Sequence, residues 1–283
     1  MHRARSPYLI LILFFILGVR VMSGQSFFNQ IKGARSNALA NQGVAIQGTE
    51  GWPVNPASLG FAPLSSLIIS GESRFAGSGI RGSGLLSTIM LNDYSSLGIG
   101  AEYYGLPEYH QQAFKIGYGR ALSNRWSIGS NFQYLRFFNP SSESTYIQLI
   151  TLGGMFELSR YLSLGGSVHF PFSQFKLMGQ YNFPSYHLGL RYILSDIVKV
   201  YTEIAKDHFY AWDFSIAAEY QLISVLALRM GVSTLSRSFS AGCSIQLYKK
   251  VRLDVASVFY QSIGTTPSLS LKYTFHRPGN NPE

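Results

Sequence analysis

Histidines and serines are the side chains of this sequence that could carry out nucleophilic catalysis. A catalytic serine needs a histidine base within hydrogen-bond reach and a third group that orients that base. His169 and His187 fall on the polar faces of two successive segments, whereas His110 and His208 lie beside expected loops. No G-x-S-x-G, H-E-x-x-H or P-loop pattern accompanies them. We therefore interpret them as polar interior and loop histidines, and we predict that the protein is not an enzyme.

Cofactor and metal chemistry have equally weak signals. Gly77–Gly82 matches G-x-G-x-x-G, but that pattern holds a pyrophosphate only between a strand and the start of a helix. Both of its flanks here have the alternating hydropathy of strands, which predicts a hairpin loop. The single cysteine, Cys243, excludes a disulfide scaffold and a cysteine-rich zinc site. The sequence predicts no cofactor and no metal.

The elements that position these side chains are strands. From Ser66 onwards apolar residues recur with a period of two, as in Trp212, Phe214, Ile216 and Ala218, with polar or small residues between them. Successive side chains of a strand point to opposite faces, so each segment has one apolar and one polar face. No comparable helical stripe follows the N-terminus. The sequence predicts an all-β fold.

Two all-β architectures compete, a soluble sandwich and a transmembrane antiparallel up-and-down β-barrel. The segments run for about ten residues, which suits a tilted membrane strand, whereas soluble strands are nearer five or six. Only 13% of the residues are charged, against about 25% in soluble domains. We therefore predict an outer-membrane barrel whose apolar face contacts outer-membrane lipid.

The alternating segments number fourteen, although twelve strands remain an alternative. The expected strands begin near Ser66, Ser83, Ser95, His110, Arg125, Thr145, Leu162, Ser185, Val198, Trp212, Leu226, Ser238, Val251 and Thr266. Longer connections alternate with tight ones, as in barrels with long outer loops and short periplasmic turns. This alternation predicts that both termini are periplasmic. Aromatic residues near the ends of the apolar faces fit the membrane interfaces: Tyr103, Tyr134, Phe170 and Tyr260 toward the outside, and Trp126, Tyr161 and Phe275 toward the periplasm.

Ionic side chains of both signs occur on the polar faces. They are Glu72, Arg74, Glu102, Lys115, Arg191, Lys199, Glu203, Asp213, Glu219, Arg252, Asp254 and Lys272. An Arg or Lys facing lipid at mid-depth would cost about 2–4 kcal/mol, so these groups must face the lumen. We expect a structural network that ties strands to a central plug; the alternative is a selectivity lining for a solute.

The N-terminus has the pattern of a secretory signal. Arg3 and Arg5 precede a short apolar run at residues 8–17, and Ser23 and Gly24 offer a small-residue cleavage site. We predict a signal peptide at residues 1–24, a plug or hatch at 25–64, a barrel at 65–276 and a periplasmic tail at 277–283. The net charge of +9 is scattered along the chain, which predicts no nucleic-acid partner.

The segment before the first strand is rich in small residues. Gly33–Ala45 reads G-A-R-S-N-A-L-A-N-Q-G-V-A, and Trp52–Leu59 reads W-P-V-N-P-A-S-L. Small residues suit a segment packed inside a lumen, although a loose periplasmic tail is the alternative. Arg35 is our candidate for pairing with a lumen carboxylate, and Asn55 for bonding to the lumen wall.

These two runs resemble the start of the PorV/PorQ family of Bacteroidetes outer-membrane proteins, a branch of the FadL-like barrel group. The matching residues include Gly33, Arg35, Gly43, Asn55, Pro56 and Ala57. The resemblance implies a fourteen-stranded barrel with an inserted hatch. It also implies an accessory or scaffold role in type IX secretion, with other components of that system or its cargo as partners. The short chain favours the PorQ branch or a further, uncharacterised member of the family over the PorV branch.

The alternative function is a FadL-like outer-membrane transporter of hydrophobic small molecules. Such a transporter needs an apolar pocket near the outer face and a kink in the wall. The pairs Gly153-Gly154 and Gly165-Gly166 could supply the kink, because glycine weakens strands and permits bulges. Close packing of the hatch against these glycines is the competing explanation.

Overall fold

The computed structural model describes residues 31–140, 144–172, 183–208 and 210–275. The expected signal peptide, the first residues of the expected hatch and the tail at 277–283 lie outside these ranges. None of the helices in the described residues is long and apolar enough to cross a membrane.

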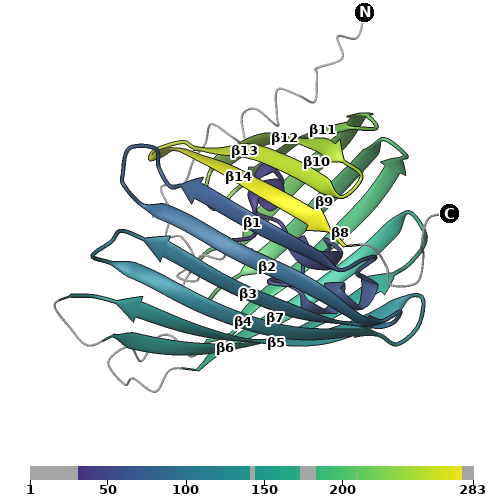
Figure 1. Ribbon diagram of the computed structural model, residues 1–283, viewed down its shortest axis with the longest axis horizontal. Helices are drawn as coiled ribbons and strands as arrows, with labels where there is room; N and C mark the ends of the chain where they lie inside the picture. Colours follow the sequence, from purple (N-terminus) through teal and green to yellow (C-terminus); the bar gives the residue numbers. More distant parts are fainter. Residues whose placement is uncertain (1–30, 141–143, 173–182, 209, 276–283) are drawn as a thin grey trace, which may run out of the picture.

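Fourteen strands form one closed antiparallel barrel (Figure 1). They are β1 (Ser66–Ser73), β2 (Arg81–Asn92), β3 (Ser95–Gly105), β4 (His110–Ala121), β5 (Trp126–Phe138), β6 (Thr145–Glu157), β7 (Leu162–Phe172), β8 (Ser185–Ser195), β9 (Val198–Lys206), β10 (Asp213–Ile223), β11 (Leu226–Ser233), β12 (Ser238–Tyr248), β13 (Val251–Tyr260) and β14 (Gly264–Thr274). Each strand pairs with its neighbours in the chain, and β1 pairs with β14 to close the sheet. The prediction of fourteen strands is confirmed.

The predicted strand starts hold within about two residues. The largest differences are at β2, which begins at Arg81 rather than Ser83, and at β14, which begins at Gly264 rather than Thr266. The barrel ladder extends these two strands past their strictly alternating parts, because the neighbouring strands still offer hydrogen-bond partners. The G-x-G-x-x-G pattern at Gly77–Gly82 spans part of the β1–β2 connection and the start of β2, so it belongs to a hairpin, as predicted.

Alternation places apolar side chains on the outside of the wall. Phe214 and Ile216 are half-exposed, whereas Ala217 and Glu219, at alternate positions further along the same strand, are buried inside. One aromatic assignment was wrong: Tyr260 faces the lumen, and its neighbour Phe259 is the outward ring. The period of two is uninterrupted along β13, so Tyr260 shares a face with Asp254.

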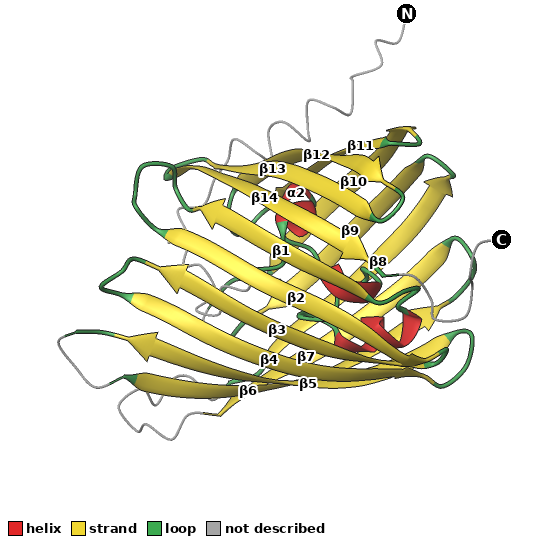
Figure 2. Cartoon of the chain, viewed as in Figure 1, coloured by secondary structure: helices red, strands yellow, loops and turns green. Residues whose placement is uncertain are grey.

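The segment before β1 lies inside the barrel. It contains a short α-helix, α2 (Ala34–Ala38), and two 3-10 helices, η1 (Gly48–Glu50) and η2 (Pro56–Phe61). Figure 2 shows these helices enclosed by the strands. From Ile31 to Leu64 nearly every residue is buried or half-buried. The hatch prediction is confirmed for the described part, and the loose-tail alternative is wrong there.

Candidate functional site in the barrel lumen

The hatch fits the wall because the inner faces of β3 to β7 carry glycines. A Cβ at Gly98 or Gly117 would overlap or crowd the indole of Trp52, and Trp52 is fully buried. A Cβ at Gly129 would overlap the backbone of Pro56. These glycines therefore let the backbone and the largest hatch side chain approach the sheet closely, at a separation that any other residue would prevent.

Asn55 is the central residue of the second family-like run. Its Oδ1 accepts the backbone N–H of Ala57 at 3.1 Å, which caps η2 directly before Pro56. Its Nδ2 donates to the carbonyl of Val44 at 2.8 Å and to that of Gly154 on β6 at 3.0 Å. One amide thus caps the start of a hatch helix, joins two parts of the hatch and fastens both to the wall. The predicted contact of Asn55 with the lumen wall is confirmed.

The first family-like run contacts both the wall and the rest of the hatch. Gly33 adopts a positive φ of 94° at the start of α2, where its neighbour Ala34 donates to Ser270 of β14. A Cβ at Gly43 would crowd Val54 of the hatch at 2.6 Å, while the Gly43 N–H donates to Glu203 of the wall at 2.9 Å. Gly43 packs against the hatch itself because the chain folds back between η1 and η2.

The kink that the two glycine pairs could have supplied is absent from the β6–β7 ladder. The β6–β7 pairing runs through Gly153, Gly154, Gly165 and Gly166 without a register shift. A Cβ at Gly153 would overlap Asn55 Oδ1, and one at Gly165 would overlap the carbonyl of Val44. These inward glycines receive the hatch, as the competing explanation required.

Arg35 enters a chain of ion pairs that crosses from the hatch to the wall. Its Nε lies 3.0 Å from Glu219 Oε2 on β10, which confirms the predicted carboxylate partner. Glu219 is shared with Arg229, at 2.6 Å. Arg229 reaches Asp254 at 3.1 Å, and Asp254 reaches Arg252 at 3.0 Å. The network predicted from the polar faces therefore exists and includes the hatch.

Glu50 of η1 closes this network from the hatch side. Its carboxylate lies 2.5 Å from Arg252, 3.2 Å from Lys272 and 3.9 Å from Arg35. Burial by itself raises the pKa of a carboxyl, but Lys272, Arg252 and Arg35 together outweigh burial and hold the pKa of Glu50 well below its usual range. Glu50 is therefore ionised at neutral pH and ties the hatch to β13 and β14.

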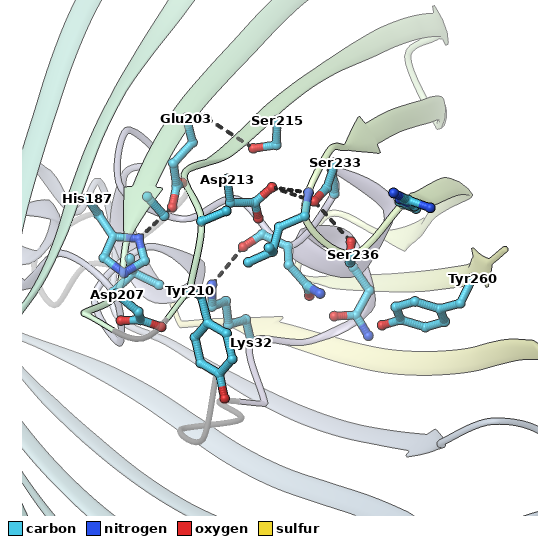
Figure 3. Close-up of a pocket in the computed structure, with 18 of the residues that line it drawn as sticks. Lys32, His187, Glu203, Asp207, Tyr210, Asp213, Ser215, Ser233, Ser236 and Tyr260 are labelled. Atoms are coloured by element: carbon cyan, nitrogen blue, oxygen red, sulfur yellow. Dashed lines mark hydrogen bonds and ion pairs between the residues drawn. The ribbon is translucent and has the colours of Figure 1, made fainter. Parts of the chain in front are cut away.

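A second anchor lies in the half of the lumen nearer the longer connections between strands, which we call the outer half because long loops are expected outside; Figure 3 shows it in close-up. Glu203 Oε2 accepts the backbone N–H groups of Gly43 and Val44 at 2.9 and 3.2 Å. Its Oε1 lies 2.9 Å from His187 Nδ1. His187 in turn lies edge-on to His169, with ring centroids 4.9 Å apart. The two histidines are interior residues, as predicted.

His169 has no catalytic arrangement within the described residues. Its ring nitrogens lie 2.9 Å from Thr151 Oγ1 and 3.3 Å from Ser167 Oγ. No carboxylate is hydrogen-bonded to His169 in this part of the chain, so the orienting group of a triad is missing. No cluster of metal-ligating side chains occurs among these residues either. The absence of enzymatic function stays a prediction.

The remaining predicted charges also face inward and are paired. Lys115 contacts Glu102 at 2.6 Å, Arg74 contacts Glu72 at 3.5 Å, Arg191 contacts Glu157 at 3.3 Å, and Lys199 approaches Glu219 at 3.6 Å. Asp213 accepts a hydrogen bond from Ser233 at 2.8 Å. These pairs confirm the prediction that the charged side chains face the lumen. The physical reason is that lipid on the other side of the wall offers these groups no partner.

Sequence reasoning missed four charged members of the site. Arg229 and Glu157 occupy inward strand positions, and Lys32 and Glu50 belong to the hatch. Arg229 stands between Leu228 and Met230, so the same alternation could have found it. Lys32 and Glu50 had no such signal, since the hatch has no period from which a direction can be read.

Two cavities lie on opposite sides of the hatch. The outer one has a volume of about 280 Å³, and its lining includes Val54 and Ala40 of the hatch with Glu203 and Ala205 of β9. The second cavity, on the other side of the hatch, has a volume of about 390 Å³ and lies beside Glu50. The lumen is therefore divided by the hatch rather than filled by it.

An apolar cluster faces the lumen in the outer half of β4, β5 and β6. It consists of Ala113, Leu135, Ile147 and Leu149, with Phe137 packed beside it. All four core members are nearly fully buried. Contact with lipid calls for apolar residues only on the outer face of the strands, so these lumen-facing apolar residues are not explained by it. We call this set the inner apolar wall.

Comparison with known proteins gives a likeness of fold. No family model and no curated protein matches the sequence. Among solved structures, the toluene transporter TodX of Pseudomonas putida superposes with a TM-score of 0.63 and 14% identity, covering 88% of this chain and 98% of TodX. The toluene transporter TbuX of Ralstonia pickettii gives 0.60 and 11%, covering 86% and 98%. A FadL homologue of Pseudomonas aeruginosa gives 0.61 and 10%, covering 86% and 98%.

The strand topology and this likeness together define the class of fold. The chain is a closed fourteen-stranded antiparallel β-barrel with a hatch inside its lumen, and its fold is similar to those of TodX, TbuX and the FadL homologue.

Proposed function

We propose that the protein is an outer-membrane transporter of small hydrophobic molecules. The observation that carries the proposal is the cavity of about 280 Å³ on the outer side of the hatch, in the same half of the lumen as the inner apolar wall. Ligand pockets usually have volumes of about 300–1,000 Å³, so this one suits a molecule at the small end of that range. The solved structures similar in fold to this chain include proteins described as toluene transporters.

The hatch separates this cavity from the periplasmic one, so transport requires the hatch to move or the solute to pass beside it. Some of the contacts that hold the hatch beside the outer cavity, such as those of Glu203 with Gly43 and Val44, are hydrogen bonds that water can replace. The polar lining contributed by Glu203, Asp213 and His187 suits a solute with a hydrogen-bonding group as well as an apolar body.

The test is solute uptake by cells that display the barrel but lack their own barrels for hydrophobic solutes. Radiolabelled toluene and oleate are the two probes. The variant Ala205→Trp fills the outer cavity, and Ala218→Trp puts the same side chain on the lipid-facing side of β10. We expect uptake above the empty-vector rate, lost in Ala205→Trp and kept in Ala218→Trp. Uptake at the empty-vector rate for both probes would contradict the proposal.

The second candidate is the accessory role in type IX secretion implied by the PorV/PorQ resemblance. It is favoured by a hatch bonded to separate parts of the wall, through Arg35 to β10 and Asn55 to β6, because a scaffold needs no open path. Affinity purification of the tagged barrel from its native outer membrane tests this role. Recovery of type IX components or cargo, absent from a control barrel of equal abundance, is the expected result for a scaffold.

A further inference from the structure

The cavity on the other side of the hatch has a different chemistry. Its lining includes Ser224 and Val225 of the β10–β11 turn and Thr274 at the end of β14. Short turns mark the expected periplasmic end of the barrel, so this cavity of about 390 Å³ faces the periplasm. It is almost devoid of large apolar side chains.

Cations outnumber anions around this cavity. The cations that line it are Arg35, Lys199, Arg229, Arg252 and Lys272. Among the described residues the carboxylates paired with them are Glu50, Glu219 and Asp254. The nearby Arg191 is neutralised by Glu157. Two positive charges are therefore left without a counter-charge in this part of the lumen.

The excess charge is mostly buried. The Arg229 side chain is 3% exposed and that of Lys272 18%, whereas Lys199 reaches 40%. Unneutralised charge in a site of low dielectric constant is costly unless an opposite charge joins it. The protein groups cannot supply that charge, because every carboxylate present is already shared between at least two cations.

Donor groups also remain unused at the cavity. The closest carboxylate oxygen to Lys199 Nζ is 3.6 Å away, and Arg35 Nη1 approaches Glu50 only to 3.9 Å. Both distances exceed those of a charge-assisted hydrogen bond. An oxyanion offers several acceptors at once, and guanidinium groups bind such anions with paired hydrogen bonds.

We propose that the periplasmic cavity is a binding site for a small oxyanion with two negative charges, of the phosphate or dicarboxylate class. The closed sheet separates it from the lipid headgroups of the surrounding leaflet, and the hatch separates it from the outside. The anion therefore enters from the periplasm. This site is independent of whether the outer cavity carries a hydrophobic solute.

The experiment is calorimetric titration of the purified full-length mature barrel with sodium phosphate and, separately, with sodium succinate. Ionic strength is matched with sodium chloride throughout. We expect saturable binding of at least one of the two anions, and the responding anion identifies the phosphate or the dicarboxylate class. Lys199→Gln should weaken the Kd about fivefold, the upper end for a partly exposed charge pair, and Lys199→Arg should restore it.

The matched control is Lys206→Gln, at the opposite end of β9. Lys206 donates to the carbonyl of Tyr210 outside the cavity, so its replacement should leave the Kd unchanged. Lys199 makes no hydrogen bond within the described residues, so the barrel should fold without it; the heat-modifiable mobility of each variant on gels checks this. Absence of saturable binding for both anions overturns the proposal, as does equal affinity of wild type and Lys199→Gln.

Discussion

Single buried charges hold the hatch in its place, and Glu50 shows how. Its side chain is 3% exposed and contacts three cations from the hatch, β13 and β14. Breaking a buried ion pair by removing one partner typically costs about 3–5 kcal/mol, because the other charge is left uncompensated. Glu50→Gln should therefore lower the unfolding midpoint of the barrel in urea at neutral pH.

The effect of Glu50 should depend on pH with a definite sign. The folded pKa of Glu50 is held well below the usual carboxyl value, which is about 4.3 in the unfolded chain. Its contribution to stability is therefore complete above that unfolded value and is lost as the pH falls through the folded pKa. The difference between wild type and Glu50→Gln should be constant from pH 6 to 8 and shrink in acid. A difference that grows in acid would contradict the assignment.

The pair of Lys115 and Glu102 gives a second test at this scale. The two side chains are 0% and 3% exposed and 2.6 Å apart. Lys115→Met should destabilise the barrel by about 3–5 kcal/mol, because Glu102 keeps a buried charge. The double variant with Glu102→Leu should recover most of that loss. Additive losses in urea unfolding would show that the two residues do not act as a pair.

At the scale of elements, the strands accept the hatch through inward glycines. Gly153 and its neighbour Gly154 point to opposite sides of β6, and only the inward Cβ would meet the hatch, at Asn55. Gly153→Val should overpack this contact and cost about 1–3 kcal/mol. Gly154→Val should be neutral or slightly stabilising, because valine suits a strand better than glycine does. Urea unfolding of the two variants measures the difference, and equal effects would place the hatch away from β6.

For the whole molecule, the orientation in the membrane is still a prediction from loop lengths. Both Ser262, in the β13–β14 connection, and Asp196, in the β8–β9 turn, are exposed. In a Cys243→Ala background, a membrane-impermeant maleimide added to intact cells should label Ser262→Cys. It should label Asp196→Cys only after the outer membrane is permeabilised. The reverse pattern would mean that the termini lie outside.

Much of the architecture could be predicted from the sequence, for a local physical reason. A strand repeats every two residues, so polarity alone shows which side of β10 faces lipid and places Glu219 inside. The same rule placed Lys115 and Asp254 correctly, and its consistent use would have placed Arg229 inside and Tyr260 in the lumen.

The partners of these residues could not be predicted, because they are set by closure of the sheet. Arg35 and Glu219 are separated by 184 positions in the chain, and no local pattern relates them. The hatch has no period that assigns its residues to a face, so the role of Glu50 and the packing of Gly43 on Val54 were not foreseen.

The sequence by itself therefore determined the strands, their number and the direction of their side chains, because these depend on neighbours along the chain and on the cost of charge in lipid. Only the tertiary structure decided which carboxylate meets which cation, that Gly153 receives Asn55, and that the lumen holds a cavity on each side of the hatch. Those features depend on how a coiled segment without periodicity packs inside a closed sheet, where distant residues meet only after the barrel has formed.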